Sequence, residues 1–266
     1  VGSEMCIRDS ATGDTDTGAV TLNGIGSAAD SVGAAAVAIG SNAVGGKELT
    51  SITFDGAFYT TSGTQTYTAD SYPINGTNTA FTASGQNITF NDAGAGTLLL
   101  SNSTNLKIDT GSTAIGNISI GREITNTAGD ATNAVDVELI AGTGSVSVST
   151  IGGTGYINDV AISAGHADGI TLNGNITTIK DTGDTVSPGG VSNSARGDVI
   201  FTGKVFLADN ITIDTSSTGN DGKVTFSTTA STINSSAANT PKSLTITSGG
   251  GDVTFAGVIG LSLIHI

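Results

Sequence analysis

The chain has 266 residues, of which 37% are hydrophobic, 5% aromatic and only 12% charged. A charge content this far below the usual quarter argues against charge-driven disorder, and 39 glycines with 3 prolines and no triplet period exclude a collagen-like chain. The formal net charge of −14 repels phosphate backbones and anionic lipid, so nucleic-acid binding and membrane-surface binding are not expected. No apolar run approaches the ~20 residues of a membrane-spanning helix, and Val32 to Ile39 is the nearest.

Both ends differ in composition from the residues between them. Residues 1–10, VGSEMCIRDS, and residues 261–266, LSLIHI, interrupt a pattern rich in Gly, Thr, Asn and Ser. The two strings resemble translated sequencing-adapter sequence, so we expect them to be non-native and the native part to be an internal fragment, residues 11–260. Cys6 and Met5 both lie in the first string. The native part then has no disulfide, no thiolate metal site and no cysteine nucleophile, which favours export weakly.

Short runs of alternating apolar and polar residues recur about every ten residues along the chain and predict strands, separated by turn-forming Gly, Asn, Asp and Ser. No stretch has a sustained helical period, and the one helix-like segment, Ala28 to Ala38, is weakened by its glycines and β-branched residues. In chain order, the predicted inward-facing positions are Val20/Leu22, Ile52/Phe54, Ile88/Phe90, Leu98/Leu100, Leu106/Ile108, Ile118/Ile120, Val135/Val137/Leu139, Val146/Val148, Val160/Ile162, Ile170/Leu172, Val199/Phe201, Ile211/Ile213, Val224/Phe226, Leu244/Ile246 and Val253/Phe255.

Longer self-similarity predicts the architecture. GDVIFTGKV, from Gly197, recurs as GDVTFAGVI, from Gly251, and GSVSVSTI, from Gly144, is a looser copy that precedes the first by nearly the same interval. VTLNG, from Val20, recurs as ITLNG, from Ile170, and NITF, from Asn87, recurs as NITI, from Asn210. Repetition of single strands is typical of a solenoid, in which each turn buries its apolar face against its neighbours.

We therefore predict an all-β fold, a single-stranded parallel β-helix occupying residues 11–260. Roughly 20 to 25 residues per rung give about ten to twelve rungs and a rod on the order of 50 Å long. A β-sandwich is the rival interpretation, since strands at a regular spacing of about 8 to 12 residues fit it too. It is less favoured because the chain lacks tryptophan, a cysteine pair and a recurring hairpin motif.

The series GSVSVSTIGG, ITLNGNITT, GDVIFTGKVFLADNITIDT, GKVTF and SLTITSGGGDVTFAGVIG resembles the repeat region of filamentous-haemagglutinin-like surface proteins of Gram-negative bacteria. GTQTYTADSYPINGTNTAFTASGQNITF, from Gly63, resembles a further unit, because the interval from Tyr67 to Phe90 is close to that from Phe201 to Phe226. The resemblance implies a right-handed helix, export by a two-partner or autotransporter route, and adhesion. Locally, AVAIGSNAVGG at residues 36–46 is similar to one head repeat of a trimeric autotransporter adhesin, though it occurs once.

An enzyme would need convergent acids, bases or ligands, and few candidates exist. His166 is the only histidine of residues 11–260 and is expected in a solvated turn. The strongest enzyme alternative is a β-helix polysaccharide lyase or hydrolase using Asp181, Asp184 and Arg196; the plain interpretation of the two aspartates is turn formation. A calcium-stabilised surface-layer or matrix protein is a second alternative, although the glycine-rich nonapeptide of calcium-binding solenoids is not met. We predict no catalytic, cofactor-binding or metal-binding residue.

Six residues are candidate adhesion contacts. Arg196, Gly197 and Asp198 spell an integrin-type tripeptide, but Gly197 and Asp198 recur in the repeat as Gly251 and Asp252 and therefore also fit a structural turn. Tyr59, Tyr67 and Tyr72 lie in the aromatic-rich stretch from Phe54 to Phe90. That stretch is either an extruded loop that offers tyrosines to glycans, or wider rungs filled by larger rings, and the second interpretation is favoured.

Seven N-x-S/T sequons, which reflect a composition rich in these residues, begin at Asn75, Asn87, Asn102, Asn117, Asn175, Asn210 and Asn234. The function that this sequence predicts is a structural rod segment of a large secreted bacterial surface adhesin, associated with the outer membrane and without catalytic activity. Its partners would be glycans or surface proteins bound through regions outside the fragment. Stacking of the fragment end to end is expected, because its terminal rungs would be uncapped.

Overall fold

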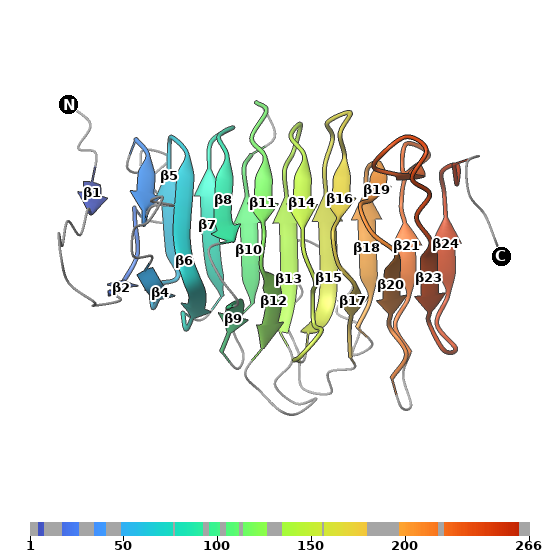
Figure 1. Ribbon diagram of the computed structural model, residues 1–266, viewed down its shortest axis with the longest axis horizontal. Helices are drawn as coiled ribbons and strands as arrows, with labels where there is room; N and C mark the ends of the chain where they lie inside the picture. Colours follow the sequence, from blue (N-terminus) through green and yellow to red (C-terminus); the bar gives the residue numbers. More distant parts are fainter. Residues whose placement is uncertain are drawn as a thin grey trace.

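In the computed structural model, the described residues are 5–7, 18–26, 35–40, 49–76, 78–92, 96–101, 105–111, 114–126, 135–155, 157–179, 197–217 and 221–260. None of them is helical, and the named strands follow one another as an elongated array with β1 (Met5–Ile7) and β24 (Val253–Phe255) toward its opposite ends (Figure 1). Every pairing between named strands is parallel, for example the one that joins Met5 to Val37 and the one that joins Leu106 to Val137. The chain is therefore a parallel β-helix, and the β-sandwich alternative, which requires antiparallel sheets, is wrong.

The strands form three faces. On the first face the order is β1 (Met5–Ile7), β3 (Val37–Ile39), β6 (Gln65–Ile74), β8 (Ile88–Asp92), β11 (Ile118–Ile120), β14 (Val146–Val148), β16 (Ile170–Leu172), β19 (Val205–Leu207) and β22 (Ile233–Ser235). The second face has β5 (Phe58–Thr61), β7 (Thr79–Ala83), β10 (Leu106–Asp109), β13 (Val135–Ile140), β15 (Ile157–Ser163), β18 (Val199–Thr202), β21 (Val224–Phe226) and β24 (Val253–Phe255).

The third face is assembled from shorter pieces, namely β2 (Ala19–Leu22), β4 (Leu49–Phe54), the second half of β6, β9 (Thr97–Leu100), β12 (Glu123–Asn126), β17 (Ile176–Thr177), β20 (Ile211–Asp214) and β23 (Leu244–Thr247). Isolated bridges from Ile124 to Ile151 and from Ile151 to Ile176 join its two halves. Strand β6 belongs to two faces, because its first residues pair with β8 and its last with β9. Each rung thus runs from the first face to the third and then to the second.

Rung length varies more than the sequence indicated. Rung length can be measured as the sequence separation between paired residues of adjacent strands on the second face. This separation is shortest from Phe58 to Ala80 and longest from Val160 to Val199. The expected rung of roughly 20 to 25 residues therefore fits only the shorter rungs. Within the described part of residues 11–260, eight named strands from β3 to β22 follow one another on the first face, and a bridge from Ile233 to Ile259 adds a ninth position, slightly fewer than the expected number of rungs.

The long sequence repeat spans two rungs. Val199 pairs with Val224, which pairs in turn with Val253, so GDVIFTGKV and GDVTFAGVI occupy the same face two rungs apart. The looser copy, GSVSVSTI, is not a structural equivalent, because its Val146 lies on the first face and Val199 on the second. Likewise NITF of β8 and NITI of β20 lie on different faces. Similar strand sequences therefore occur on different faces, so sequence similarity alone does not identify structurally equivalent strands.

The interior is a set of columns in which each buried side chain contacts its equivalent in the next rung. All the inward positions predicted from alternation lie in strands, and nearly all are buried, with Val20 and the residues of β23 and β24 the exceptions. On the third face an isoleucine column runs through Ile124, Ile151, Ile176, Ile213 and Ile246. Columns of like side chains about 4.8 Å apart satisfy packing and backbone hydrogen bonding together.

Several regions singled out by the sequence lie outside the described residues. Most of the weak helix candidate, residues 28–34, does so, while Val37–Ile39 at its end is strand β3 rather than helix. Only residues 36–40 of the segment similar to a trimeric-adhesin head repeat are described. Right-handedness of the helix stays a prediction.

Candidate functional site

The integrin-type tripeptide is not an exposed motif in the described part of the chain. Arg196 lies outside the described residues, Gly197 is buried, and Asp198 is only 4% exposed. Gly197 has a φ of 78°, and a Cβ there would lie 2.7 Å from the carbonyl oxygen of Ile179, so glycine is required by the turn. Asp198 as an adhesion contact is therefore wrong: an integrin-type site needs an accessible carboxylate, and this one is used inside the fold.

Asp198 belongs to a ladder that we call the aspartate ladder, formed by Asn105, Asp136, Asp159 and Asp198. These residues lie at the point where successive rungs enter the second face. In each case the side-chain Oδ1 accepts a hydrogen bond from a backbone N–H of the next rung; the donors are Asp136 at 3.0 Å, Asp159 at 3.0 Å, Asp198 at 2.6 Å and Lys223 at 2.8 Å. Side-chain oxygens thus satisfy backbone donors where the chain turns and the regular ladder is interrupted.

The three candidate tyrosines are core residues. Tyr59, Tyr67 and Tyr72 are each 0% exposed, so their assignment as adhesion contacts is wrong. Their rings fill rungs of the stack, as the favoured interpretation expected, although the rung from Phe58 to Ala80 is the shortest in sequence on the second face. Tyr67 pairs in register with Phe90, with ring centroids 5.1 Å apart, just as Phe201 stacks on Phe226 at 5.0 Å. Larger rings fill the early rungs around β6, the longest strand of the described residues.

Each buried phenol has hydrogen-bond partners. The Tyr59 hydroxyl accepts from the Gly56 N–H at 2.8 Å and donates to the Leu22 carbonyl at 2.8 Å. The Tyr72 hydroxyl contacts the Tyr67 carbonyl at 3.0 Å and the Asn91 carbonyl at 2.8 Å. Burial raises the pKa of Tyr59 to about 12, opposed by the Gly56 N–H and reinforced by the charge of Asp55. Burial likewise raises the pKa of Tyr67 far above its usual value, with Tyr59 adding to the effect.

Sequence reasoning missed Gln65, the polar centre of this aromatic region. Gln65 is 0% exposed, and its Nε2 donates to the Tyr59 carbonyl at 2.8 Å and the Thr82 carbonyl at 2.8 Å. Its Oε1 accepts from the Tyr67 hydroxyl at 3.1 Å. A glutamine two positions before an inward tyrosine was the available signal, because alternation then places both side chains in the core.

Arg122 is a second residue that the sequence did not reveal. It is 3% exposed, and its guanidinium donates to the Gly96 carbonyl at 3.4 Å and the Ala69 carbonyl at 3.3 Å. These carbonyls belong to preceding parts of the stack at the corner between the first and third faces. The five N–H donors of arginine suit a role in which one side chain ties several rungs together.

Four of the seven sequons have a structural explanation. Asn87, Asn117, Asn175 and Asn210 each stand immediately before a strand whose first residue is a buried isoleucine followed by an outward Thr or Ser. Asn117 Oδ1 accepts from the Ser145 N–H at 2.9 Å and the Ser145 hydroxyl at 3.0 Å, and Asn87 Oδ1 accepts from the Asn117 N–H at 2.9 Å. The motif N-I-T/S therefore has a structural origin at these four positions. The asparagine lies at the corner, the isoleucine points inward and the Thr or Ser points outward.

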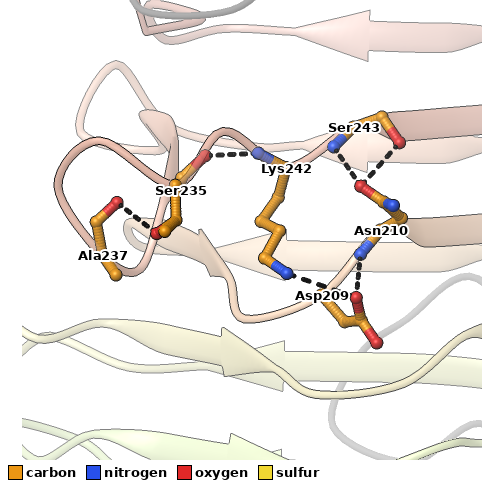
Figure 2. Close-up of polar contacts among 7 residues, drawn as sticks. Asp209, Asn210, Ser235, Ala237, Lys242 and Ser243 are labelled. Carbon is orange, nitrogen blue, oxygen red and sulfur yellow. Dashed lines mark hydrogen bonds and ion pairs between the residues drawn. The ribbon is translucent and has the colours of Figure 1, made fainter.

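Figure 2 shows the same arrangement at the corner that leads into β20 and β23. Asn210 Oδ1 accepts from the N–H of Ser243 at 3.0 Å and from its hydroxyl at 3.1 Å. Beside it, Lys242 Nζ lies 3.4 Å from Asp209 Oδ1. The Asn210 N–H and then Lys242 lower the pKa of Asp209. Both partners are solvent-accessible, and the pair links the turn before β20 to the turn before β23.

His166 lies in a turn, as predicted, and its side chain is 34% exposed. Its Nδ1 accepts from the Asp168 N–H at 3.1 Å and lies 3.2 Å from Asp168 Oδ2. Asp181 and Asp184, the proposed enzyme carboxylates, lie outside the described residues, as does Arg196. Their convergence stays a prediction.

Neither metal-binding clusters nor membrane spans occur in the described ranges. They contain no group of three or more His, Cys, Asp or Glu side chains placed to hold a metal ion. They also contain no helix of the length and apolarity that crossing a bilayer requires.

The chain is a parallel β-helix whose corners are fixed by hydrogen bonds of Asn and Asp side chains and by turn glycines. This fold defines its class, the β-solenoid repeat proteins. Comparisons with protein-family models, with curated proteins and with solved structures found no match. The assignment to a class therefore depends on the fold alone.

Proposed function

We propose that this chain is a structural rod segment of a large secreted bacterial surface adhesin, held at the outer membrane of a Gram-negative cell and without catalysis of its own. The observation that carries the proposal is the continuity of the three faces, in which parallel, in-register pairing runs from β2 and β3 to β23 and β24. A stack with hydrogen bonds along its whole axis resists bending and extension, which suits a spacer that holds a binding region away from a cell.

The interior supports the same proposal. The aspartate ladder, Gln65 and Arg122 satisfy backbone groups and tie rungs to one another. These buried polar residues thus hold the stack together. Their arrangement favours a mechanical role over a β-helix lyase or hydrolase, whose acids and bases would have to face a substrate groove.

The test combines location with activity. Antibodies raised against the full chain should label intact, unpermeabilised cells of the source organism, and external protease should abolish the labelling. The purified chain should release no reducing ends or unsaturated products from a panel of acidic polysaccharides. Labelling only after permeabilisation would contradict the surface role, and product formation that is lost in Asp181→Asn or Asp184→Asn would establish the enzyme instead.

A further inference from the structure

A hollow of about 470 Å³ opens at the edge where the second face turns into the first. It is lined by four successive turns, with Gly142, His166, Gly203, Lys204, Thr228 and Ala230 among its residues. None of these residues belongs to the aspartate ladder, the aromatic core or the corner of Figure 2. The hollow is therefore separate from the features described above.

Unequal turn lengths create the hollow. Between β18 and β19 the chain turns in only two residues, Gly203 and Lys204. The turns of the rungs on either side, residues 164–169 and 227–232, have six residues each. The short turn is recessed between two longer turns, so Gly203 and Lys204 form the floor and the neighbouring turns form the walls.

The floor depends on glycine. Gly203 has a φ of 128°, and a Cβ at this position would lie 2.1 Å from the carbonyl oxygen of Ala164 in the preceding rung. Its N–H donates to the Ser231 hydroxyl at 3.3 Å, which joins the floor to the following rung. Any larger residue at position 203 would push this turn away from the preceding rung. The close contact between Gly203 and Ala164, which keeps the turn recessed, therefore requires glycine.

The hollow brings two nitrogen donors together in a chain whose net charge is −14. Among the described residues no carboxylate lies within ion-pair distance of Lys204, whereas Lys107 pairs with Glu138 at 3.4 Å and Lys242 with Asp209 at 3.4 Å. His166 Nδ1 accepts a hydrogen bond from the Asp168 N–H, so the ring proton lies on Nε2 and can be donated to a ligand. Both groups can donate to one ligand.

Hydroxyl groups complete the lining. Ser163, Thr202 and Thr228 line the hollow, and Thr202 Oγ1 lies 2.8 Å from the Ser227 hydroxyl of the next rung. Serine and threonine hydroxyls both donate and accept, as the hydroxyls of a sugar ring do. A cation set among hydroxyls in a cavity of this size therefore matches a small polar ligand that carries one negative charge.

We propose that this hollow binds a carboxylate-bearing saccharide, a uronic acid unit of an acidic polysaccharide. The carboxylate contacts Lys204 Nζ and His166 Nε2, and the ring hydroxyls contact the Ser and Thr side chains. The inference stands on the geometry of the turns and does not depend on the adhesin proposal. Because the surrounding protein is strongly acidic, the affinity expected for a single unit is in the millimolar range.

The experiment is a titration of the ¹⁵N-labelled full chain, followed by amide chemical shifts, with galacturonate and with trigalacturonate. Galactose, acetate and inorganic phosphate serve as matched ligands. Saturable shifts at Gly203, Lys204 and His166 are expected with both galacturonates, and Lys204→Gln should raise the dissociation constant about tenfold. Lys223→Gln removes the same charge outside the hollow and should leave the dissociation constant unchanged.

Four outcomes would overturn the proposal. One is the absence of saturable shifts at Gly203 and Lys204 up to about 100 mM galacturonate, well above the expected range. A second is equal binding of acetate or phosphate, which would show a general anion site without saccharide recognition. A third is an equal effect of Lys204→Gln and Lys223→Gln on the dissociation constant, which would show that only the net charge of the protein matters. Ala230→Tyr fills the hollow while leaving Lys204 in place, so unchanged binding by that variant would place the ligand elsewhere.

Discussion

At the residue scale, position along the strand decides whether a polar side chain supports the fold. Gln65 and Tyr67 point inward from β6 and bond to each other, while the hydroxyl of Tyr59 bridges Gly56 and Leu22. A buried polar group is costly unless it is paired, and the side chains of Gln65, Tyr67 and Tyr59 each have a backbone or side-chain partner. The polar groups of the core therefore fix the register of the rungs that they join.

The raised tyrosine pKa values predict alkaline destabilisation. Because the fold raises the pKa of Tyr59 from 10.0 to about 12, and that of Tyr67 further, folding favours the neutral phenols. This stabilisation is complete below pH ~10, where the unfolded chain also keeps its phenols neutral, and is lost as pH rises toward ~12. The melting temperature followed by circular dichroism should therefore fall steeply over that interval.

Tyr67→Phe is the control for this prediction. It should cost about 1 kcal/mol at neutral pH through the lost hydrogen bond to Gln65, yet show a shallower fall above pH ~10. A melting temperature that stays constant across the interval, or a variant with the same slope as the parent, would contradict the assignment of the effect to these phenols.

At the element scale, each strand contributes one rung of a column, so its inward residues depend on the strands before and after it. Val199 of β18 pairs with Val160 of β15 and Val224 of β21, and all three side chains are 0% exposed. Strands β18 and β21 are short, yet each is held on both sides. Loss of one rung therefore removes a partner from two others.

Val199→Asp should unfold this region cooperatively. A carboxylate at that position has neither water nor a partner in the apolar column, and the cost should be several kcal/mol. Thr225→Asp, on the outward side of β21 one rung further along, should change stability by less than about 1 kcal/mol. Thermal unfolding by calorimetry measures both, and an unchanged transition in Val199→Asp would refute the columnar core.

At the scale of the whole molecule, the rung that contains β24 leaves its apolar side chains exposed. Val253, Phe255, Val258 and Ile259 are between 36% and 64% exposed, whereas Val224 and Phe226 in the rung before are buried. Phe255 stacks on Phe226 with centroids 5.0 Å apart, which is the spacing of Phe201 on Phe226. Phe255 thus extends the stacked column of Phe201 and Phe226, and its outer side is available to a further strand of the same kind.

We predict that the purified chain self-associates end to end. Sedimentation velocity should show concentration-dependent assembly, because an exposed parallel edge with an apolar column is a template for another rung. The double variant Phe255→Lys with Val258→Lys should shift the protein toward the monomer. Ile115→Lys is the matched control, since Ile115 is 61% exposed but lies in a turn far from this edge, and an equal effect of this control would refute the end-to-end arrangement.

Alternation of apolar and polar residues was enough to predict the strands and their inward side chains, and the recurrence of strand sequences was enough to predict a solenoid. These features are local or recur at short intervals, and a period of two fixes which side of a strand is buried. Strands such as β6 and β19 were missed because their alternation is shorter or mixed with polar residues that point inward, as Gln65 does.

Only the tertiary structure decided which face each strand joins, how long each rung is, and that Asp198 and the three tyrosines are buried. The physical reason is that turn length determines which strands become neighbours, and turns of two to six residues are equally compatible with the same alternating pattern. The recessed turn at Gly203 and Lys204 is visible only when the rungs on both sides are in place, because it is the difference between neighbouring turns that makes the hollow.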